Sequence, residues 1–155
     1  MNRQTDGLTQ PQLDDSRSVS FTVHGLAAPA GSKTLGYNSG GRAFVRDASK
    51  RSAPWKKHVA REAALAMDGR PLLEGALRLG VVFTMPRPKG HYGAKGLRPS
   101  APEYPTVRPD VTKLLRAVED ALTGIVWRDD SQVVWQVAWK EYGEPAHCIV
   151  TVTQL

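Results

Sequence analysis

Three aspartates in the second half of the chain have the side chains and the surroundings that suit a divalent cation. Asp129 and Asp130 follow the apolar residues 125–127 and precede a strongly apolar segment. Two carboxylates in such surroundings repel each other, and a divalent cation would keep both ionised. Asp110, 20 residues before Asp130, is the third candidate ligand. The alternative roles are a helix N-cap for Asp110 and a solvated turn for the acidic pair.

Basic residues are concentrated in two other segments, which could bind a polyanion. Residues 32–61 carry eight Lys and Arg and one acid, and residues 86–116 carry seven Lys and Arg and two acids. Residues 117–155 reverse the balance, with six acids and two basic residues. Phosphodiester chemistry on nucleic acid needs both features, because basic residues neutralise phosphates while carboxylates hold metal ions at the cut. The alternative is a basic surface that only aids solubility.

Several classes of protein are excluded by what the sequence lacks. Cys148 is the single cysteine, which excludes a disulfide framework within the monomer and a cysteine-based zinc site. The four histidines have no regular spacing, and no P-loop precedes Lys33, so a histidine metal site and a nucleotide cofactor are not expected. No apolar segment has the length of a membrane span or a signal peptide. We therefore expect a cytoplasmic protein without a membrane partner.

The pattern of apolar residues predicts a mixed sheet with two main helices, an α/β or α+β fold. Alternating apolar residues predict strands over 18–24, 77–83, 133–139 and 147–154. Residues 52–67 predict an amphipathic helix that begins with Ser52 as its cap. Residues 109–124 predict the clearest helix, with Asp110 as N-cap and Gly124 after its last turn. A helix of this length spans ~18 Å, so Asp110 meets the acidic pair only if the chain doubles back or the elements are adjacent.

The remaining segments predict an arm and two loops around a single domain. Residues 1–18 are polar and predict a disordered arm, which leaves residues 19–155 as the domain. Residues 25–41 predict a mobile loop followed by a possible short strand over 43–45. Residues 86–109 contain six prolines and predict a long loop whose basic bias favours a function.

One segment carries a family resemblance. The sequence from Arg108 to Val134, RPDVTKLLRAVEDALTGIVWRDDSQVV, resembles the signature of the RusA-type Holliday junction resolvases, in which a D-x-D-N-x-x-K helix is followed by D-A-L and D-D-S-Q-V. The resemblance is strong over residues 106–143 and is consistent in order and spacing over most of the chain after residue 18. It implies a RusA-like fold and a homodimeric endonuclease of bacteria or phages, acting in recombination and repair.

The resemblance also implies a cofactor, a substrate and the roles of individual residues. Family members use Mg²⁺, for which Mn²⁺ is expected to substitute, to cut four-way DNA junctions by symmetric paired incisions. The motifs assign metal binding and catalysis to Asp110, Asp129 and Asp130, with Asp130 the stronger of the pair, and place the motif's basic residue at Arg116. The basic residues that we expect to contact DNA are Lys33, Arg42, Lys56, Lys57, Arg87, Lys89, Arg98, Arg108 and Lys113.

The sequence departs from the family pattern at two positions. Thr112 replaces the second aspartate of the helix motif, and Lys113 replaces the asparagine. A hydroxyl is a weaker ligand than a carboxylate, and an ammonium group opposes a cation. A protein that binds branched DNA without cutting it is therefore the second hypothesis. The third is a module for single strands or RNA, with Tyr37, Tyr92 and Tyr104 as stacking platforms.

Overall fold

The computed structural model describes residues 17–31, 33–47 and 50–155, without the side chains of residues 33, 34 and 45–47. The predicted arm over residues 1–18 lies outside the described residues except for its last two positions, and Ser18 is the first residue of a strand. Among the described residues, no helix is long and apolar enough to cross a membrane.

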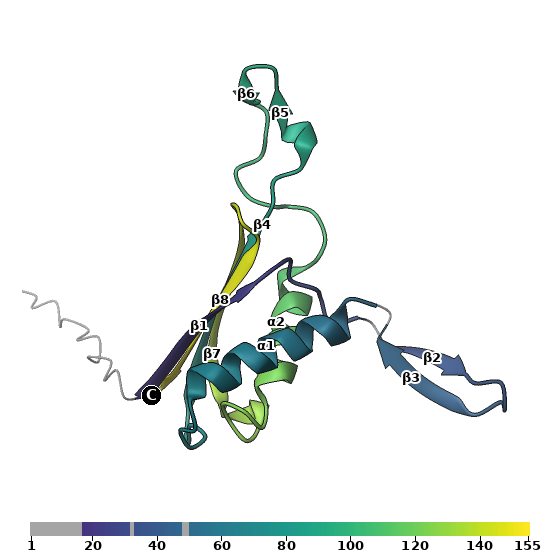
Figure 1. Ribbon diagram of the computed structural model, residues 1–155, viewed down its shortest axis with the longest axis vertical. Helices are drawn as coiled ribbons and strands as arrows, with labels where there is room; N and C mark the ends of the chain where they lie inside the picture. Colours follow the sequence, from purple (N-terminus) through teal and green to yellow (C-terminus); the bar gives the residue numbers. More distant parts are fainter. Residues whose placement is uncertain (1–16, 32, 48–49) are drawn as a thin grey trace, which may run out of the picture.

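A four-stranded mixed sheet forms the centre of the molecule (Figure 1). Its strands are β1 (Ser18–His24), β4 (Leu77–Met85), β7 (Val133–Tyr142) and β8 (His147–Gln154), in the order β1-β8-β4-β7. β8 runs antiparallel to both β1 and β4, and β7 runs parallel to β4. All four strands were predicted, because alternating side chains mark a sheet with one buried face.

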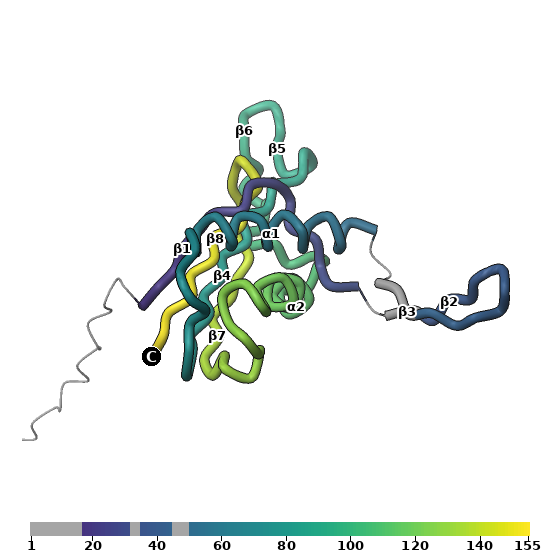
Figure 2. Tube along the Cα trace, turned by 60° about the horizontal axis from the view of Figure 1, so that its bottom comes forward, coloured from purple at the N-terminus to yellow at the C-terminus, as the bar shows by residue number. Residues whose placement is uncertain are grey.

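Two helices cover one face of this sheet and enclose the core (Figure 2). α1 (Ser52–Met67) packs against β1 and α2, and α2 (Val111–Leu122) packs against β7. The buried stripe of α1 consists of Trp55, Val59, Ala63 and Met67 and meets inward-facing residues of the sheet such as Leu79, Val81 and Phe83. The helical content and the mixed sheet agree with the predicted α+β class. One detail of the prediction is wrong: the N-cap position of α1 is Arg51, and Ser52 is buried inside the first turn.

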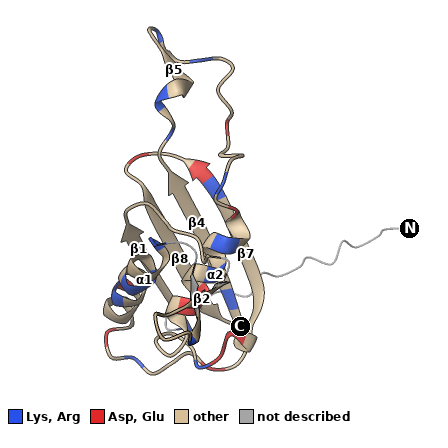
Figure 3. Ribbon diagram, turned by 90° about the vertical axis from the view of Figure 1, so that its right-hand side faces the viewer, with Lys and Arg blue, Asp and Glu red and all other residues tan. Residues whose placement is uncertain are grey.

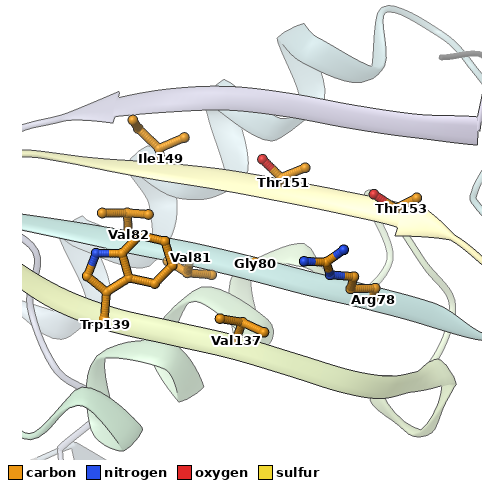
Figure 4. Close-up of a pocket in the computed structure, with 9 residues that line it drawn as sticks. All are labelled: Arg78, Gly80, Val81, Val82, Val137, Trp139, Ile149, Thr151 and Thr153. Carbon is orange, nitrogen blue, oxygen red and sulfur yellow. The ribbon is translucent and has the colours of Figure 1, made fainter. Parts of the chain in front are cut away.

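Within residues 17–31, 33–47 and 50–155, no helix covers the opposite face of the sheet. The Trp139 ring extends from β7 toward Val82 on β4 (Figure 4). Together with Ile149, it borders a shallow hollow of about 300 Å³ above Gly80. Arg78 stacks its guanidinium on the ring of Trp135 at the other end of this hollow, 4.7 Å from the ring centroid. The two tryptophans remain about half exposed, so this face is apolar and open.

Two hairpins project from the body (Figure 1). β2 (Lys33–Tyr37) and β3 (Ala43–Asp47) form the first, where we predicted a loop with a strand only over 43–45. The Asn38 side chain accepts hydrogen bonds from the backbone N–H groups of Gly40 and Arg42 and closes the turn. This local bonding stabilises a strand that the Gly- and Ser-rich sequence does not reveal.

The second projection belongs to the predicted long loop. It contains the short helix η2 (Lys89–His91) and the two-residue strands β5 (Tyr92–Gly93) and β6 (Gly96–Leu97). Arg87 holds its base, because the guanidinium donates to the carbonyl oxygen of Pro102 at 2.6 Å and lies over the ring of Tyr142.

Candidate functional site

Helix α2 runs antiparallel to β7, and this direction positions the predicted site residues. Near the end of α2, the Gln136 amide donates a hydrogen bond to the Glu119 carboxylate. Near its start, the Lys140 ammonium donates to the carbonyl oxygens of Val107 at 2.8 Å and Pro109 at 2.9 Å. The beginning of α2 therefore lies beside the end of β7, and the end of α2 lies beside the beginning of β7.

Counting only the residues that the structure describes, the first end of α2 presents one carboxylate and several basic groups. Asp110 occupies the predicted N-cap position, but its side chain makes no capping hydrogen bond. Its carboxylate instead lies 3.5 Å from the ammonium of Lys113, and the two side chains are 58% and 51% exposed. Asp110 also borders a hollow of about 350 Å³ together with Arg51 and Arg108. A cation at this end would have one carboxylate for attraction and three basic side chains against it.

The second end of α2 presents the carboxylates of Asp130 and Glu119, and hydrogen bonds hold the first of them in place. Asp130 accepts hydrogen bonds from the hydroxyl of Thr123 and from the indole N–H of Trp127, the latter at 2.9 Å. Trp127 is fully buried, so the indole fixes the position of an exposed carboxylate. Partial burial raises the pKa of Glu119, and the nearby charge of Asp130 raises it further. The two carboxylates therefore repel each other, which is the electrostatic condition that a bound cation relieves.

Asp129 has a different role from its neighbour. Its carboxylate accepts a hydrogen bond from the backbone N–H of Ser131 at 2.8 Å and caps the short helix η3 (Asp130–Gln132). The Gln132 side chain completes a capping box by accepting from the backbone N–H of Asp129. Hydrogen bonds from Ser131 also hold the pKa of Asp129 below its ordinary value. The expectation that apolar surroundings press Asp129 and Asp130 together is wrong, because both are exposed and their side chains have separate partners.

Asp110 and Asp130 do not meet within one chain. They flank a helix of 12 residues, which spans ~18 Å at ~1.5 Å per residue. The described residues contain no group of three or more acids, histidines or cysteines placed to hold a metal ion together. We had expected the three aspartates to converge on a shared ion; a single folded chain does not achieve this, because the straight helix between them acts as a spacer.

A polar stripe, exposed except at the half-buried Glu119, connects the two ends of α2. Thr112, Arg116, Glu119 and Thr123 recur at helical spacing and lie on one side of the helix. The spacing of Arg116 and Asp120 allows an i,i+4 pair on the helix, but the Asp120 carboxylate pairs with the Lys56 ammonium of α1 at 2.7 Å. Arg116 is exposed and contributes to lowering the pKa of Glu119 against the larger opposing effects. Sequence reasoning missed Glu119, although its place on this stripe was a usable signal.

The predicted DNA-contacting residues fall into two groups: side chains that are exposed and side chains that are bonded to partners within the chain. Lys57, Lys89 and Arg108 are exposed, as is Arg42 on the first hairpin, while the side chain of Lys33 lies outside the described part. Four others have partners within the chain: Lys56, Arg87, Arg98 and Lys113. Basic residues occur on α1 and along the second projection (Figure 3). Tyr37 is on the first projection, whereas Tyr92 and Tyr104 belong to the long loop.

Comparison with known proteins gives two findings. The family model described as "Endodeoxyribonuclease RusA" matches residues 28–153. A relative from Bacillus subtilis (strain 168), "Uncharacterized protein YqaN", is 30% identical over 142 residues, which cover 88% of this chain and 96% of the relative. The family match spans both ends of α2 and the whole of β7.

Proposed function

The chain belongs to the RusA endodeoxyribonuclease family, and on this premise we propose that it cuts four-way DNA junctions as a Mg²⁺-dependent homodimer. The reaction is a pair of symmetric incisions, one by each of two sites related by a two-fold axis. Branched DNA is the substrate and recombination or repair is the setting. The same family membership favours a DNA-acting role over an RNA-binding module.

The observation that carries this proposal is the distribution of acids at the two ends of α2. In the described part of the chain, Asp110 is the one carboxylate at the first end, while Asp130 and Glu119 lie together at the second. A two-fold axis that places two α2 helices side by side in opposite directions brings Asp110 of one subunit to Asp130 of the other. Each dimer then has two complete sites, and a monomer has none.

The side chains at these ends fit Mg²⁺ in their chemistry. Mg²⁺ takes hard oxygen ligands and is commonly held by one or two carboxylates together with substrate phosphate. Asp130 and Glu119 meet that description; partial burial raises the pKa of Glu119 most, and the nearby negative charge of Asp130 raises it further. What such an ion supplies when bound is a more acidic water and neutralisation of the scissile phosphate. Mn²⁺ has the same ligand preference and is expected to substitute.

The remaining residues bind and orient the DNA. Arg116 lies on the stripe between the two ends and is exposed, so its guanidinium can offset charge on the phosphate being cut. Trp127 and Thr123 hold the Asp130 carboxylate in place before the substrate binds. Lys57, Lys89 and Arg42 are exposed and contact backbone phosphates away from the cut.

A second candidate function has one observation in its favour. The Lys113 ammonium, 3.5 Å from Asp110, partly neutralises the single carboxylate at that end, and Thr112 adds no charge. A protein with this site could bind four-way junctions without cutting them. Incubation of the purified protein with an end-labelled four-way junction and Mg²⁺ separates the two, because tight binding without any product contradicts the nuclease.

A mixed-subunit experiment tests the shared site directly. Asp110→Asn and Asp130→Asn homodimers should both be inactive. When the two chains are co-expressed, half of the dimers are mixed, and each mixed dimer regains one intact site from Asp110 of one chain and Asp130 of the other. We expect recovery of about a quarter of the wild-type incisions, as nicks in one strand only.

The control replaces one partner with the double variant Asp110→Asn, Asp130→Asn. A dimer of this chain with Asp110→Asn contains no intact site and should stay inactive. If the first mixture stays inactive as well, although mixed dimers are detected by mass, the two aspartates do not act together across subunits.

A further inference from the structure

Three adjoining hollows lead from Asp110 along helix α1. The first is the hollow of about 350 Å³ that Asp110 borders together with Arg108 and Arg51. Arg51 also borders the second hollow, of about 280 Å³, to which His24 and His58 belong as well. His58 in turn borders the third hollow, of about 300 Å³. Because each hollow shares a side chain with the next, the three adjoin one another on the surface.

Basic side chains dominate the borders of these hollows. Asp110 is the one acid among the described residues that border them. The lysines and arginines there are all exposed: Lys50, Arg51, Lys57, Arg61, Arg108 and Lys113. A row of positive charges attracts a polyanion more strongly than isolated basic side chains do. We call the three hollows with these six residues and His58 the basic track.

The fold creates the basic track where the starts of two helices meet. Arg51 is at the N-cap position of α1 and Asp110 is at that of α2, and both residues border the first hollow. Along α1, the positions of Arg51, Lys57, His58 and Arg61 fall within an arc of about 120°, at ~100° per residue. One side of α1 therefore continues the first hollow as a line of basic residues.

The basic track also has hydrogen-bond donors that lack acceptors. The Arg51 guanidinium donates to the carbonyl oxygen of Leu26 at 3.1 Å, which in the described part of the chain uses one of its five N–H groups. Trp55 borders the second hollow, and its buried indole N–H has no acceptor among the described residues. The Trp55 ring lies edge-on to that of His58, with 6.1 Å between the centroids. Phosphate oxygens are the acceptors that such a set of donors favours.

One acid lies beside the third hollow and pairs with two residues of the track. The Glu62 carboxylate is 2.8 Å from the Arg61 guanidinium and 3.6 Å from the His58 ring nitrogen. The Arg61 side chain is nevertheless 69% exposed. Exposed ion pairs contribute little stability, so Arg61 can exchange Glu62 for a phosphate at little cost.

We propose that the basic track binds one strand of a DNA arm, with successive phosphates running from the first hollow past Arg51 and His58 to Arg61. This inference deepens the proposed function and rests on it, because it specifies the path of the junction arm that leaves the cut. From Arg51 to Arg61, α1 rises ~15 Å at ~1.5 Å per residue, which matches roughly four nucleotides of a duplex at ~3.4 Å each.

Salt dependence of junction binding tests the contacts one at a time. Lys50→Gln and Arg51→Gln each remove one charge, and each neutralised phosphate adds about 0.9 to the slope of log K against log salt. In EDTA, where the DNA stays uncut, each variant should lower that slope by about one and weaken binding at 0.1 M salt by about tenfold. Fluorescence anisotropy with a labelled four-way junction measures both quantities.

Two further variants serve as controls. Arg17→Gln removes an exposed charge at the other end of β1 from His24, so its slope should equal that of the wild type. Arg51→Lys keeps the charge and should keep the slope, even if loss of the bond to Leu26 lowers the Tm. If Arg51→Lys loses as much slope as Arg51→Gln, or if Arg17→Gln loses as much as Lys50→Gln, the proposal is overturned.

Cross-linking to DNA tests the direction of the path. Lys50→Cys and Arg61→Cys, each carrying a photoactivatable label on the new thiol, should cross-link to the same strand of an arm. The nucleotide reached from residue 50 should lie nearer to the branch point than the one reached from residue 61. The reverse order, or cross-links to different arms, would contradict the proposed path.

The native cysteine does not interfere with this experiment. Cys148 is fully buried, and burial raises its pKa to about 12, so the label should not attach to the unmodified chain. Arg17→Cys carries the same label on an exposed position outside the track and should give little cross-linking.

The outcomes separate this inference from the proposed function. A wild-type chain that does not cut junctions, with weakened binding and a lower slope in Lys50→Gln and Arg51→Gln, supports the track and contradicts the nuclease. Junction cleavage by the wild type, with unchanged slopes in both variants, supports the nuclease and contradicts the track. A wild-type chain that does not bind junctions contradicts both.

Discussion

The two ends of α2 differ in how the fold treats a carboxylate. At the first end, Asp110 is exposed and its negative charge is offset by Lys113 within the same turn. At the second end, Asp130 is anchored by Thr123 and by the buried Trp127, and its charge adds to that of Glu119. At the first end, a basic side chain of the same chain partly neutralises the carboxylate. At the second end, two neighbouring carboxylates leave the surroundings negative. The comparison shows that the fold gives two aspartates of one motif different electrostatic surroundings.

The largest expected effect comes from removing the anchored carboxylate. Asp130→Asn keeps the shape of the side chain and removes its charge, so we expect cleavage of a four-way junction to fall by at least about 1,000-fold. Junction binding should be intact or tighter, because a negative charge near the phosphate is lost. A gel assay for cleavage and a filter assay for binding measure the two quantities.

Asp129→Asn is the matched control for this prediction. It changes the neighbouring residue in the same way, but the lost charge belongs to the cap of η3. We expect cleavage within a few-fold of the wild type and a lower Tm. The hydrogen bonds indicate that Asp129 caps η3 and that Asp130 acts in cleavage. Equal loss of cleavage in both variants would contradict this difference in role.

We expect a smaller effect on cleavage when the first end of α2 is given a second carboxylate, as the second end has. Thr112→Asp adds a carboxylate one turn or less from Asp110, which should lower the Mg²⁺ concentration for half-maximal cleavage by roughly tenfold. Lys113→Asn should act in the same direction by removing the competing charge. Titration of cleavage with Mg²⁺ measures both, and an unchanged requirement would mean that position 112 does not face the metal.

The smallest effect concerns the stability of the second end without metal. The pKa of Glu119 is raised in the folded chain, so the folded state keeps this proton to a higher pH than the unfolded state does. Stability is therefore lost as the pH rises from the ordinary range of a glutamate through the folded pKa. In EDTA, Glu119→Gln should remove that loss, and solvent screening keeps the gain at pH 8 below about 1 kcal/mol.

Urea unfolding at pH 8 and at pH 3.5 measures this difference. At pH 3.5 the carboxyl is protonated in both states, so the variant and the wild type should be equally stable. A variant that is less stable than the wild type at pH 8 would contradict the repulsion between Glu119 and Asp130.

Local sequence patterns were sufficient for most of the fold. The strands β1 and β8 were predicted with their observed ends, since the alternation of apolar residues has the period of a strand with one buried face. The end of α2 was predicted from Gly124, which adopts a positive φ of 82° after the last turn. β2 was missed, because its stability depends on its pairing with β3 and on the turn at Asn38.

Local sequence patterns predicted only part of the candidate site. Asp110 and Asp130 were identified as residues from the motif, and both lie at an end of α2 as their spacing requires. Their separation, the pairing of Asp120 with Lys56, and the approach of Glu119 to Asp130 were not predicted. Each of these depends on contacts between residues far apart in the chain or on the orientation of a side chain.

By itself, the sequence determined the elements, their periods and the acids available for chemistry, because these depend on residues within a few positions of one another. Only the tertiary structure decided that α2 lies antiparallel on the edge strand β7 and holds the acids apart. The physical reason is that a helix fixes the distance between its ends, while the packing of its apolar face decides which other residues each end meets.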